Sequence, residues 1–422
     1  MTTNYLQPVR GTKDLHSQSI LHFNHIISIA KQQAKLFAFE ELQTPIFEFS
    51  QIFSQNLGES SDIVNKEVYQ FNDRSQHSLT LRPEFTAAVV RALLSNGELL
   101  QSLPRRFFSF GPLFRYDRPQ KGRQRQFHQI NYEFFGCSSI YTDAEAIVLA
   151  CLLLANFGIL SQVTCELNSL GCPLSKKNYE QALFVYFQQF SQQLSFDSQQ
   201  RLHKNPLRIL DSKDEGDILL IKNAPLISDF YSNEAKMRFA NLCSLLDSLN
   251  ITYRINPRLV RGLDYYTSTV FEFVMQHDGA QNTVLAGGRY DNLVEKMGKK
   301  SVPAIGFASG VERIMLLSSY QQITSRIIAV CYVATSQQKQ AFLLANQLRT
   351  NDFEVCLLHD SSLKKQLKYA NQQQAKFALI LGEEEVNNNN ILCKNLITAE
   401  QQLISNDKLE QFLSQQLPIC QL

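Results

Sequence analysis

The residues best suited to chemistry lie in one stretch, Phe114 to Gly136, which reads FRYDRPQKGRQRQFHQINYEFFG. Its centre is a loop that is dense in cations and almost free of apolar residues. The cations of this loop are Arg118, Lys121, Arg123 and Arg125. Such a density of donors suits a polyanion such as a phosphate chain. Basic hairpin tips are also commonly no more than solvated, so the loop alone does not decide between the two readings.

The residues after this loop alternate with period two, which predicts a β-strand and makes the stretch a hairpin of two strands. One face carries Phe127, Gln129, Asn131, Glu133 and Phe135, and the other carries His128, Ile130, Tyr132 and Phe134. We expect the mainly apolar face to pack in a core and the polar face to line a pocket. Arg115, just before the loop, could reach into that pocket.

Three further segments gather ionisable and hydroxyl side chains. These are TLRPEFTA with Arg82, Glu84 and Thr86, LVRGLDYYTSTVFEF with Arg261, Asp264, Tyr265 and Tyr266, and AGGRYDN with Arg289, Tyr290 and Asp291. Each of them alone is also compatible with a structural salt bridge or a capped turn, because buried ion-pair networks produce similar clusters.

The segment PAIGFASGVERIMLL carries small residues at period two, namely Gly306, Ala308 and Gly310. One strand face is therefore bare, and a flat heteroaromatic ring could lie against it. Arg313 follows in the first turn of an expected helix, where a guanidinium could meet a phosphate. The alternative is tight packing of helix on strand. The sequence holds neither a P-loop nor a dinucleotide-binding glycine motif, so any nucleotide must be held by arginines and a sheet floor.

Length and composition place the chain among cytosolic proteins of more than one domain. It has 422 residues, 44% of them hydrophobic, and a formal net charge of +2. A charge so near zero means that nucleic-acid binding must rest on local basic patches. The nine cysteines form no C-x-x-C pair, so we predict neither a metal site nor disulfides. No run approaches the roughly 18 apolar residues that span a bilayer, so we expect no membrane contact and a cytoplasmic location.

The apolar spacing predicts a first helix over Ser17 to Phe37. The stretch around Pro45 reads as an edge or partner-contacting strand, and two more strands surround Tyr69 to Leu81. Pro83 is expected in the first turn of the next helix, with Glu84 at its positive end.

The region from Cys172 to about Asn250 changes character and predicts a helical insertion without strands. Strand patterns resume at Tyr253. We therefore divide the chain into a catalytic domain (1–171 and 251–320), an insertion (172–250) and a small parallel α/β domain (326–422). The run Asn387 to Asn390 is expected to be a loop.

Taken together, these segments resemble the class II aminoacyl-tRNA synthetases, and within them the histidyl-tRNA synthetase family. The stretch around Pro45 is similar to the dimer-forming motif 1, FRYDRPQKGRQRQFHQ to motif 2 and GFASGVERIMLL to motif 3. These three name only the class. RGLDYYTSTVFEF, AGGRYD and TLRPE resemble the histidine-specific signatures and occur in the family's order.

The resemblance implies an α+β fold: a six-stranded antiparallel sheet flanked by helices, with a helical insertion and a C-terminal α/β anticodon-binding domain. It implies a homodimer that activates L-histidine with ATP and Mg²⁺ and transfers histidine to tRNA(His). Arg115 and Arg261 would meet the α-phosphate and Arg313 the γ-phosphate. Further contacts to ATP or tRNA are implied for a loop that includes Gln120, Arg123 and Arg125.

The resemblance also implies where histidine binds. Glu84, Thr86 and Gln129 would hold the substrate's ammonium and carboxylate, and Glu133 and Tyr266 would bracket the imidazole. The remaining lining residues would be Tyr265 and Tyr290. Phe85 stands where the family motif often has glycine, which puts the backbone beside Glu84 in doubt because phenylalanine adopts positive φ at a cost.

Two other readings stay open. A non-catalytic paralogue, such as the histidine-sensing regulatory subunit of a biosynthetic transferase, would bind histidine and charge nothing. It would be expected to lose Arg115, Arg261 and Arg313, which this chain keeps. A class II synthetase for another amino acid is the second alternative.

Overall fold

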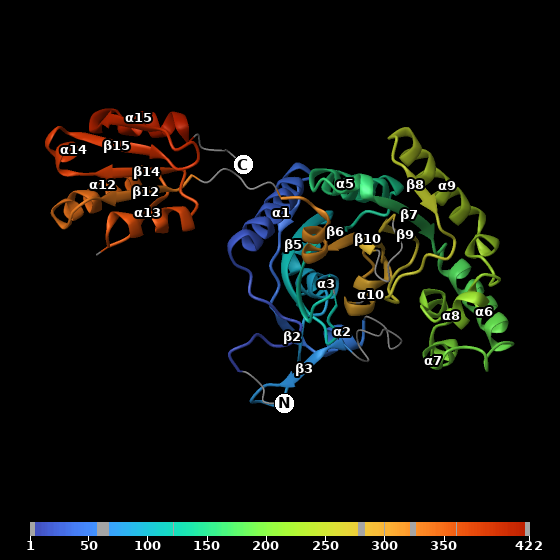
Figure 1. Cartoon of the computed structure of the whole chain (residues 1–422). Coiled ribbons are helices and arrows are strands. Elements are labelled where there is room, and N and C mark those ends of the chain that lie inside the picture. Colours follow the sequence, from blue (N-terminus) through green and yellow to red (C-terminus); the bar gives the residue numbers. More distant parts are fainter. Residues whose placement is uncertain are drawn as a thin grey trace. The chain divides into compact units, whose positions relative to one another are not determined.

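The computed structural model describes residues 5–56, 67–120, 122–276, 283–298, 300–320, 326–359 and 361–417. The chain divides into two compact units, Met1–Ser319 and Tyr320–Leu422, which are described separately (Figure 1). No helix among these residues has both the length and the apolar character needed to cross a membrane.

An eight-stranded sheet forms the centre of the first unit. In spatial order its strands are β1 (Glu40–Glu41), β5 (Arg105–Phe114), β6 (Gln126–Phe135), β11 (Ala304–Gly310), β10 (Thr283–Arg289), β9 (Thr269–Met275), β7 (Val163–Ser169) and β8 (Tyr253–Ile255). The inner six strands are antiparallel, as predicted, but the expected total of six is too low. Two short strands, β1 and β8, extend the edges by parallel pairing with β5 and β7. The strand pattern that resumes at Tyr253 begins with β8, whereas β1, at two residues, is too short to leave a pattern.

One face of this sheet packs in a large apolar core against four helices (Figure 1). They are α1 (Ser17–Leu36), α5 (Ile140–Asn156), α9 (Asn233–Ser248) and α11 (Val311–Leu317). Strand β6 contributes Ile130, Tyr132 and Phe134 to this core, so the predicted apolar face of the hairpin is confirmed. The prediction of a first helix from Ser17 is confirmed as well. Burying this face leaves the polar face of β6 directed to the other side of the sheet.

The other face of the sheet packs in a second apolar core against four further helices. A small three-stranded sheet belongs to the same unit. The helices are α2 (Gln51–Ser54), α3 (Thr86–Ser95), α4 (Gly97–Gln101) and α10 (Asn292–Gly298), and the small sheet has the order β2 (Phe47–Phe49), β4 (Ser78–Leu81), β3 (Tyr69–Asn72). The predictions of an edge strand after Pro45 and of two strands between Tyr69 and Leu81 are therefore confirmed.

Helix α3 begins later than predicted, at Thr86 and not at Pro83. The reason is that Phe85 is the residue before the first turn, and the Glu84 carboxylate accepts hydrogen bonds from the backbone N–H groups of Thr86 and Ala87, both at 2.8 Å. Phe85 has φ −93°, so the backbone here needs no positive φ. Its ring is buried beneath the Arg82 guanidinium, 4.4 Å from the ring centroid, and the doubt about this position is removed.

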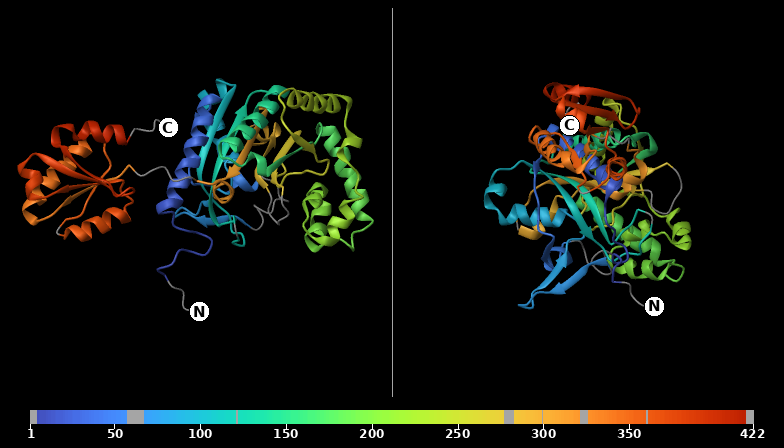
Figure 2. Two further views of the ribbon diagram at one scale, coloured as in Figure 1. Left: turned by 45° about the horizontal axis from the view of Figure 1, so that its top comes forward. Right: turned by 60° about the vertical axis from the view of Figure 1, so that its left-hand side comes forward.

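The segment between β7 and β8, all of whose residues are described, contains helices and no strand. Its elements are α6 (Pro173–Gln188), α7 (Phe196–Lys204), the 3₁₀ turn η3 (Pro206–Asp211), α8 (Glu215–Ile221), the 3₁₀ turn η4 (Ile227–Phe230) and α9, and a further 3₁₀ turn, η2 (Leu160–Gln162), precedes β7. Helices α6 to α8 share an apolar core of their own that includes Tyr179, Leu183 and Phe187. They lie beyond the β7–β8 edge of the sheet, opposite the edge beside α1 (Figure 2).

The second unit is an α/β domain with a five-stranded sheet. The strands are, in spatial order, β13 (Val355–Leu357), β12 (Ile328–Tyr332), β14 (Phe377–Leu381), β15 (Asn390–Asn395) and β16 (Gln401–Ser405), and the helices are α12 (Gln338–Thr350), α13 (Leu363–Gln372), α14 (Glu383–Asn387) and α15 (Asn406–Gln416), with a 3₁₀ turn η5 (Thr335–Gln337).

The expectation of a small parallel α/β domain is confirmed for β13, β12 and β14, the three strands on which it rested. Two further strands, β15 and β16, pair antiparallel because a short connection turns the chain back on itself. The expected loop from Asn387 to Asn390 is accordingly shorter, since Asn387 ends α14 and Asn390 begins β15.

Candidate active site

A cavity of about 480 Å³ opens on the polar face of the large sheet. Arg115 enters it from the end of β5, Arg261 from the loop after β8, and Arg313 from the first turn of α11. The side chains come from three distant parts of the sequence, and the sheet topology places them around one space. Guanidinium groups arranged in this way can neutralise a polyphosphate from several sides.

The arginines are held by different partners. Arg115 donates from Nε to the Pro83 carbonyl at 2.9 Å, and burial lowers the pKa of its guanidinium, which still stays protonated. Arg261 pairs through Nη1 with Oε2 of Glu272 at 3.1 Å. Its buried Nε makes no hydrogen bond to any described residue, so one donor remains available. Arg313 donates to the carbonyl of Thr283.

Glu133 is only 1% exposed and is not itself among the lining residues, but its three hydrogen-bond partners line the cavity. Its carboxylate accepts hydrogen bonds from Thr86 Oγ1 at 2.6 Å, from Asn131 Nδ2 at 3.0 Å and from the hydroxyl of Tyr290. Burial raises the pKa of Glu133 to about 7, although these three donors oppose the shift. A carboxylate has roughly four acceptor sites, so one more donor can be accommodated.

Glu84 and Thr86 lie beside this carboxylate, both lining the cavity. Because Glu84 caps α3, its two oxygens are already engaged by backbone N–H groups, and burial raises its pKa. The hydroxyl of Thr86 already donates its hydrogen bond to Glu133. Either residue would have to share these bonds with a ligand.

Three tyrosines form the adjoining wall. The Tyr265 ring lies 4.7 Å from that of Tyr266 and 5.5 Å from that of Tyr290, centroid to centroid. All three line the cavity with Gln129. Tyr290, expected only as a further lining residue of the same pocket, donates its hydroxyl to Glu133. A Cβ at Gly288 would lie 2.8 Å from the Tyr266 ring, so this glycine makes room for it.

The bare face of β11 forms the floor. Gly306, Ala308 and Gly310 all line the cavity. At Gly306 the missing side chain leaves room for Glu133, its neighbour on β6, since a Cβ there would overlap the carboxylate. Gly310 is different, because no atom lies within 4 Å of the position of a Cβ. The open floor for a flat ring is therefore at the Gly310 end, away from Glu133.

Comparison with known proteins decides the family. The model of the histidyl-tRNA synthetase family matches residues 11–314, and the anticodon binding domain matches residues 327–416. The histidine--tRNA ligase of Wolbachia pipientis subsp. Culex pipiens is 49% identical over 95% of this chain and 98% of its own length, and that of Rickettsia bellii is 45% identical over 97% and 99%. The crystal structure of apo Staphylococcus aureus histidyl-tRNA synthetase covers 97% of this chain and 99% of its own, with 32% identity and a TM-score of 0.81.

The chain belongs to the histidyl-tRNA synthetase family. Full-length relatives at this identity agree with the main reading and not with the regulatory paralogue. The resemblance drawn from the signature motifs is confirmed, as is the class of fold.

Against this family background, the hairpin loop contributes less to the cavity than its charge suggested. Arg123 lines the cavity and pairs with Asp117 at 2.6 Å. Arg125 lies over the Tyr116 ring at 4.0 Å, and Gln120 forms a tight turn by exchanging backbone hydrogen bonds with Arg123. Neither Arg125 nor Gln120 is among the cavity's lining residues. Lys121 lies outside the described residues.

Other arginines of the signature motifs are structural, in line with the alternative of a structural salt bridge or capped turn. Arg82 is 2% exposed and donates to the carbonyls of Thr44 and Pro112. Arg289 is 1% exposed and pairs with Asp143 of α5 and with Asp291. The hydrogen bonds of Arg82 and the ion pairs of Arg289 fix the segments that carry Glu84 and Tyr290.

Several charged cavity residues were not found from the sequence, among them Arg208, Asp211 and Lys213 of the insertion, Glu272 of β9, Glu67 and Glu312. The stretch NPLRILDSKD is rich in charge, but it lies within a region read as a separate helical insertion. Glu272 is a charged residue inside a strand that otherwise reads as core, VFEFV, and this was the signal that could have revealed it. In the described chain no cluster of three or more His, Cys, Asp or Glu residues could hold a metal ion.

Proposed function

We propose that this protein activates L-histidine with ATP and joins it to the 3′ end of tRNA(His). In the first step a histidine carboxylate oxygen bonds to the α-phosphorus and the bond to the bridging oxygen of the β-phosphate breaks, giving histidyl-adenylate and pyrophosphate. In the second step a terminal ribose hydroxyl of tRNA attacks the acyl carbon and AMP leaves. The observation that carries the proposal is that Arg115, Arg261 and Arg313 line one cavity, whose wall also holds Thr86 and Tyr290, two partners of the buried Glu133.

The three arginines would act on the phosphates. Charge grows on the α-phosphate in the in-line transition state, so fixed cations there lower the barrier. Arg115 and Arg261 are assigned this role, the latter with the unpartnered Nε as its free donor. Arg313 would meet the γ-phosphate. Arg123, with Gln120 and Arg125 in the same hairpin loop, would add contacts to ATP or to tRNA.

The tyrosine wall and Glu133 would select histidine. A carboxylate and a hydroxyl can meet both ring nitrogens of an imidazole, a pairing that amino acids without two such groups cannot satisfy. We assign Glu133 and Tyr266 to the ring, with Tyr265 and Tyr290 beside it. Glu84, Thr86 and Gln129 are assigned to the ammonium and carboxylate of the substrate, for which Glu84 supplies negative charge.

Mg²⁺ would enter as part of the Mg-ATP substrate. The donor set fits this division, since two carboxylates of the cavity are already paired with arginines, Glu272 with Arg261 and Asp117 with Arg123. Mg²⁺ commonly keeps waters and binds through substrate phosphates instead of a protein cage. We therefore assign no dedicated protein ligand.

The domain division follows from these roles. We propose that 1–171 and 251–320 carry out activation, that 326–422 binds the anticodon of tRNA, and that 172–250 is an insertion packed at the sheet edge. A cytoplasmic location is proposed because buried free thiols such as Cys165, Cys331 and Cys393 suit a reducing compartment.

A homodimer is proposed through the small sheet. The pairing of β2, β4 and β3 places Phe47, Phe49 and Phe71 on one face, where they are 53%, 54% and 43% exposed. Aromatic side chains gathered on an exposed face are typical of interaction surfaces.

Sedimentation equilibrium should give twice the chain mass, and Phe47→Ser with Phe49→Ser should shift the protein to the monomer. A wild-type protein that sediments as a monomer at micromolar concentration would contradict the dimer.

The function is tested by two assays on purified protein. Pyrophosphate exchange into ATP should depend on histidine, and unfractionated tRNA should accept labelled histidine. Exchange that responds to threonine or proline but not to histidine would instead support a synthetase for another amino acid. Histidine binding without exchange would support the regulatory reading.

A further inference from the structure

The loop that carries Arg261, Tyr265 and Tyr266 has little backbone support of its own. In the described chain its backbone–backbone hydrogen bonds lie at its two ends, where Leu259 N–H donates to Asn256 and Thr267 N–H donates to Arg289. Between these ends the carbonyls of Arg261, Asp264 and Tyr266 accept hydrogen bonds from side chains instead. Such a loop needs side chains from elsewhere to hold one conformation.

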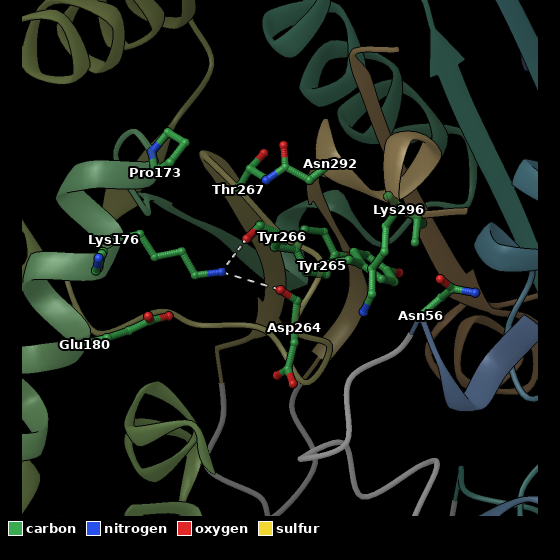
Figure 3. Close-up of a pocket in the computed structure, with 12 residues that line it drawn as sticks. Asn56, Pro173, Lys176, Glu180, Asp264, Tyr265, Tyr266, Thr267, Asn292 and Lys296 are labelled. Atoms are coloured by element: carbon green, nitrogen blue, oxygen red, sulfur yellow. Dashed lines mark hydrogen bonds between the residues drawn. The ribbon is translucent and has the colours of Figure 1, made fainter. Parts of the chain in front are cut away.

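Side chains from the insertion supply this support. Lys176 of α6 donates from Nζ to the Tyr266 carbonyl at 2.9 Å and, more weakly, to the Asp264 carbonyl at 3.4 Å (Figure 3). Asn205, just before η3, donates from Nδ2 to the Asp264 carboxylate at 2.8 Å. Arg208 of η3 donates from Nη1 to the carbonyl of Arg261 at 3.3 Å. The three donors thus reach one loop at both of its functional ends.

A cavity beside the loop makes the contacts from the insertion important for holding it in place. A cavity of about 310 Å³ separates α6 from the outer side of the loop, and Lys176 reaches across it beside Glu180 (Figure 3). On its outer side the loop therefore faces a cavity, whereas Leu259, Tyr265 and Tyr266 pack on its inner side in the second core. Burial lowers the pKa of Lys176, with Glu180 and Asp264 acting in the opposite direction. At Arg208, a Cβ on Gly262 would lie 3.1 Å from Nη1, so the guanidinium rests closely on the loop backbone.

We propose that the insertion belongs functionally to the active site, and that Lys176, Asn205 and Arg208 are positioning residues that set the loop from Arg261 to Tyr266. Lys176 acts at the tyrosine end, where histidine selection is assigned, and Arg208 acts at the end where the phosphate-binding arginine lies. The inference rests on the proposed function, because it concerns the same site.

The two ends of the loop predict different kinetic defects. Lys176→Met keeps the aliphatic stem but removes the donor, so the KM for histidine in pyrophosphate exchange should rise roughly fivefold or more, with kcat and the KM for ATP changing less than about twofold. Arg208→Met should instead lower kcat roughly tenfold with little change in the histidine KM, because it displaces Arg261.

Matched variants separate positioning from general stability. Lys176→Arg keeps a cationic donor and should recover most of the histidine KM, whereas Lys177→Met changes an exposed neighbour on the same helix and should behave as wild type. Titration of active sites with labelled ATP and histidine corrects each rate for unfolded protein. The proposal is overturned if Lys176→Met and Arg208→Met match Lys177→Met, or if both merely lower the fraction of active sites. A wild-type protein without histidine-dependent exchange would overturn the proposed function itself.

Discussion

Two regions of the candidate site differ in their surroundings: the buried Glu133 behind the cavity wall, and Arg123 of the hairpin loop, which lines the cavity. Glu133 is 1% exposed and fixed by three donors, whereas the Arg123 side chain is 44% exposed and forms an ion pair with Asp117. The contacts of Glu133 are therefore already in place without a ligand. The hairpin loop offers charge that a ligand can still rearrange. This contrast predicts large, specific losses at the first region and small, salt-dependent ones at the second.

Arg261→Met should give the largest effect. Removing a fixed cation from the reacting phosphate should lower the rate of pyrophosphate exchange on the order of a hundred- to a thousandfold, about 3–4 kcal/mol. The histidine KM should change little. Because this variant also leaves Glu272 buried without its ion partner, Arg261→Met with Glu272→Gln is the control, and it should be equally slow. A defect confined to substrate binding would remove Arg261 from the chemical step.

The titration of Glu133 should give the next largest effect, this time on stability. Its folded-state pKa, raised from 4.5 to about 7, means that the folded protein holds this proton between those pH values and the unfolded chain does not. Stability contributed by the protonated group is therefore lost as pH rises from about 4.5 to about 7. Across this window the unfolding free energy of Glu133→Gln should gain on that of the wild type, on the order of 3 kcal/mol at most.

Urea unfolding at a series of pH values measures this difference directly. Comparing the two proteins cancels the titration of all other groups. A difference that stays constant from pH 4.5 to pH 8 would show that Glu133 ionises normally in the folded protein.

Glu133→Ala tests the same carboxylate through histidine. The KM for histidine should rise roughly tenfold or more, on the order of 2 kcal/mol for a lost buried hydrogen bond. The KM for ATP should stay close to that of the wild type. An unchanged histidine KM would remove Glu133 from the amino-acid pocket and leave it as a structural partner of Thr86 and Tyr290.

These two regions also differ in how far the sequence revealed them. Alternation along β6 was enough to predict which side chains meet the core and which meet the cavity, because strand geometry fixes that choice. Arg115 and Arg313 could be placed near the cavity since each follows directly from a strand end. The partner of Glu133 could not be predicted, because Tyr266 and Tyr290 both carry a hydroxyl and only the packing of β10 against β6 and β11 selects between them.

The insertion shows more clearly which contacts the sequence does not predict. Its helices and its lack of strands follow from composition and apolar spacing, but the contact of Arg208 with the carbonyl of Arg261 joins residues 53 positions apart. No local pattern encodes such a contact. The edge strand β1 was missed for a similar reason, since the pairing of two residues depends on the neighbouring strand and not on their own sequence.

Arg123→Ala should give the smallest effect of the series. An exposed charge pair, such as that of Arg123 with Asp117, is worth little in water, roughly 0.2–1 kcal/mol. We expect a contact of the same side chain with an ATP phosphate to be worth about as little, so the KM for ATP should rise only about two- to fivefold. The loss should shrink as salt is raised from 50 to 300 mM, because exposed charges are screened while the buried arginines are screened much less. Measuring the ATP KM of Arg123→Ala and Arg115→Ala at both salt concentrations gives the comparison within one assay. A salt-independent loss of a hundredfold at Arg123 would mean that the loop closes over ATP into a buried site, and the contrast between the two regions would then hold only for the protein without substrate.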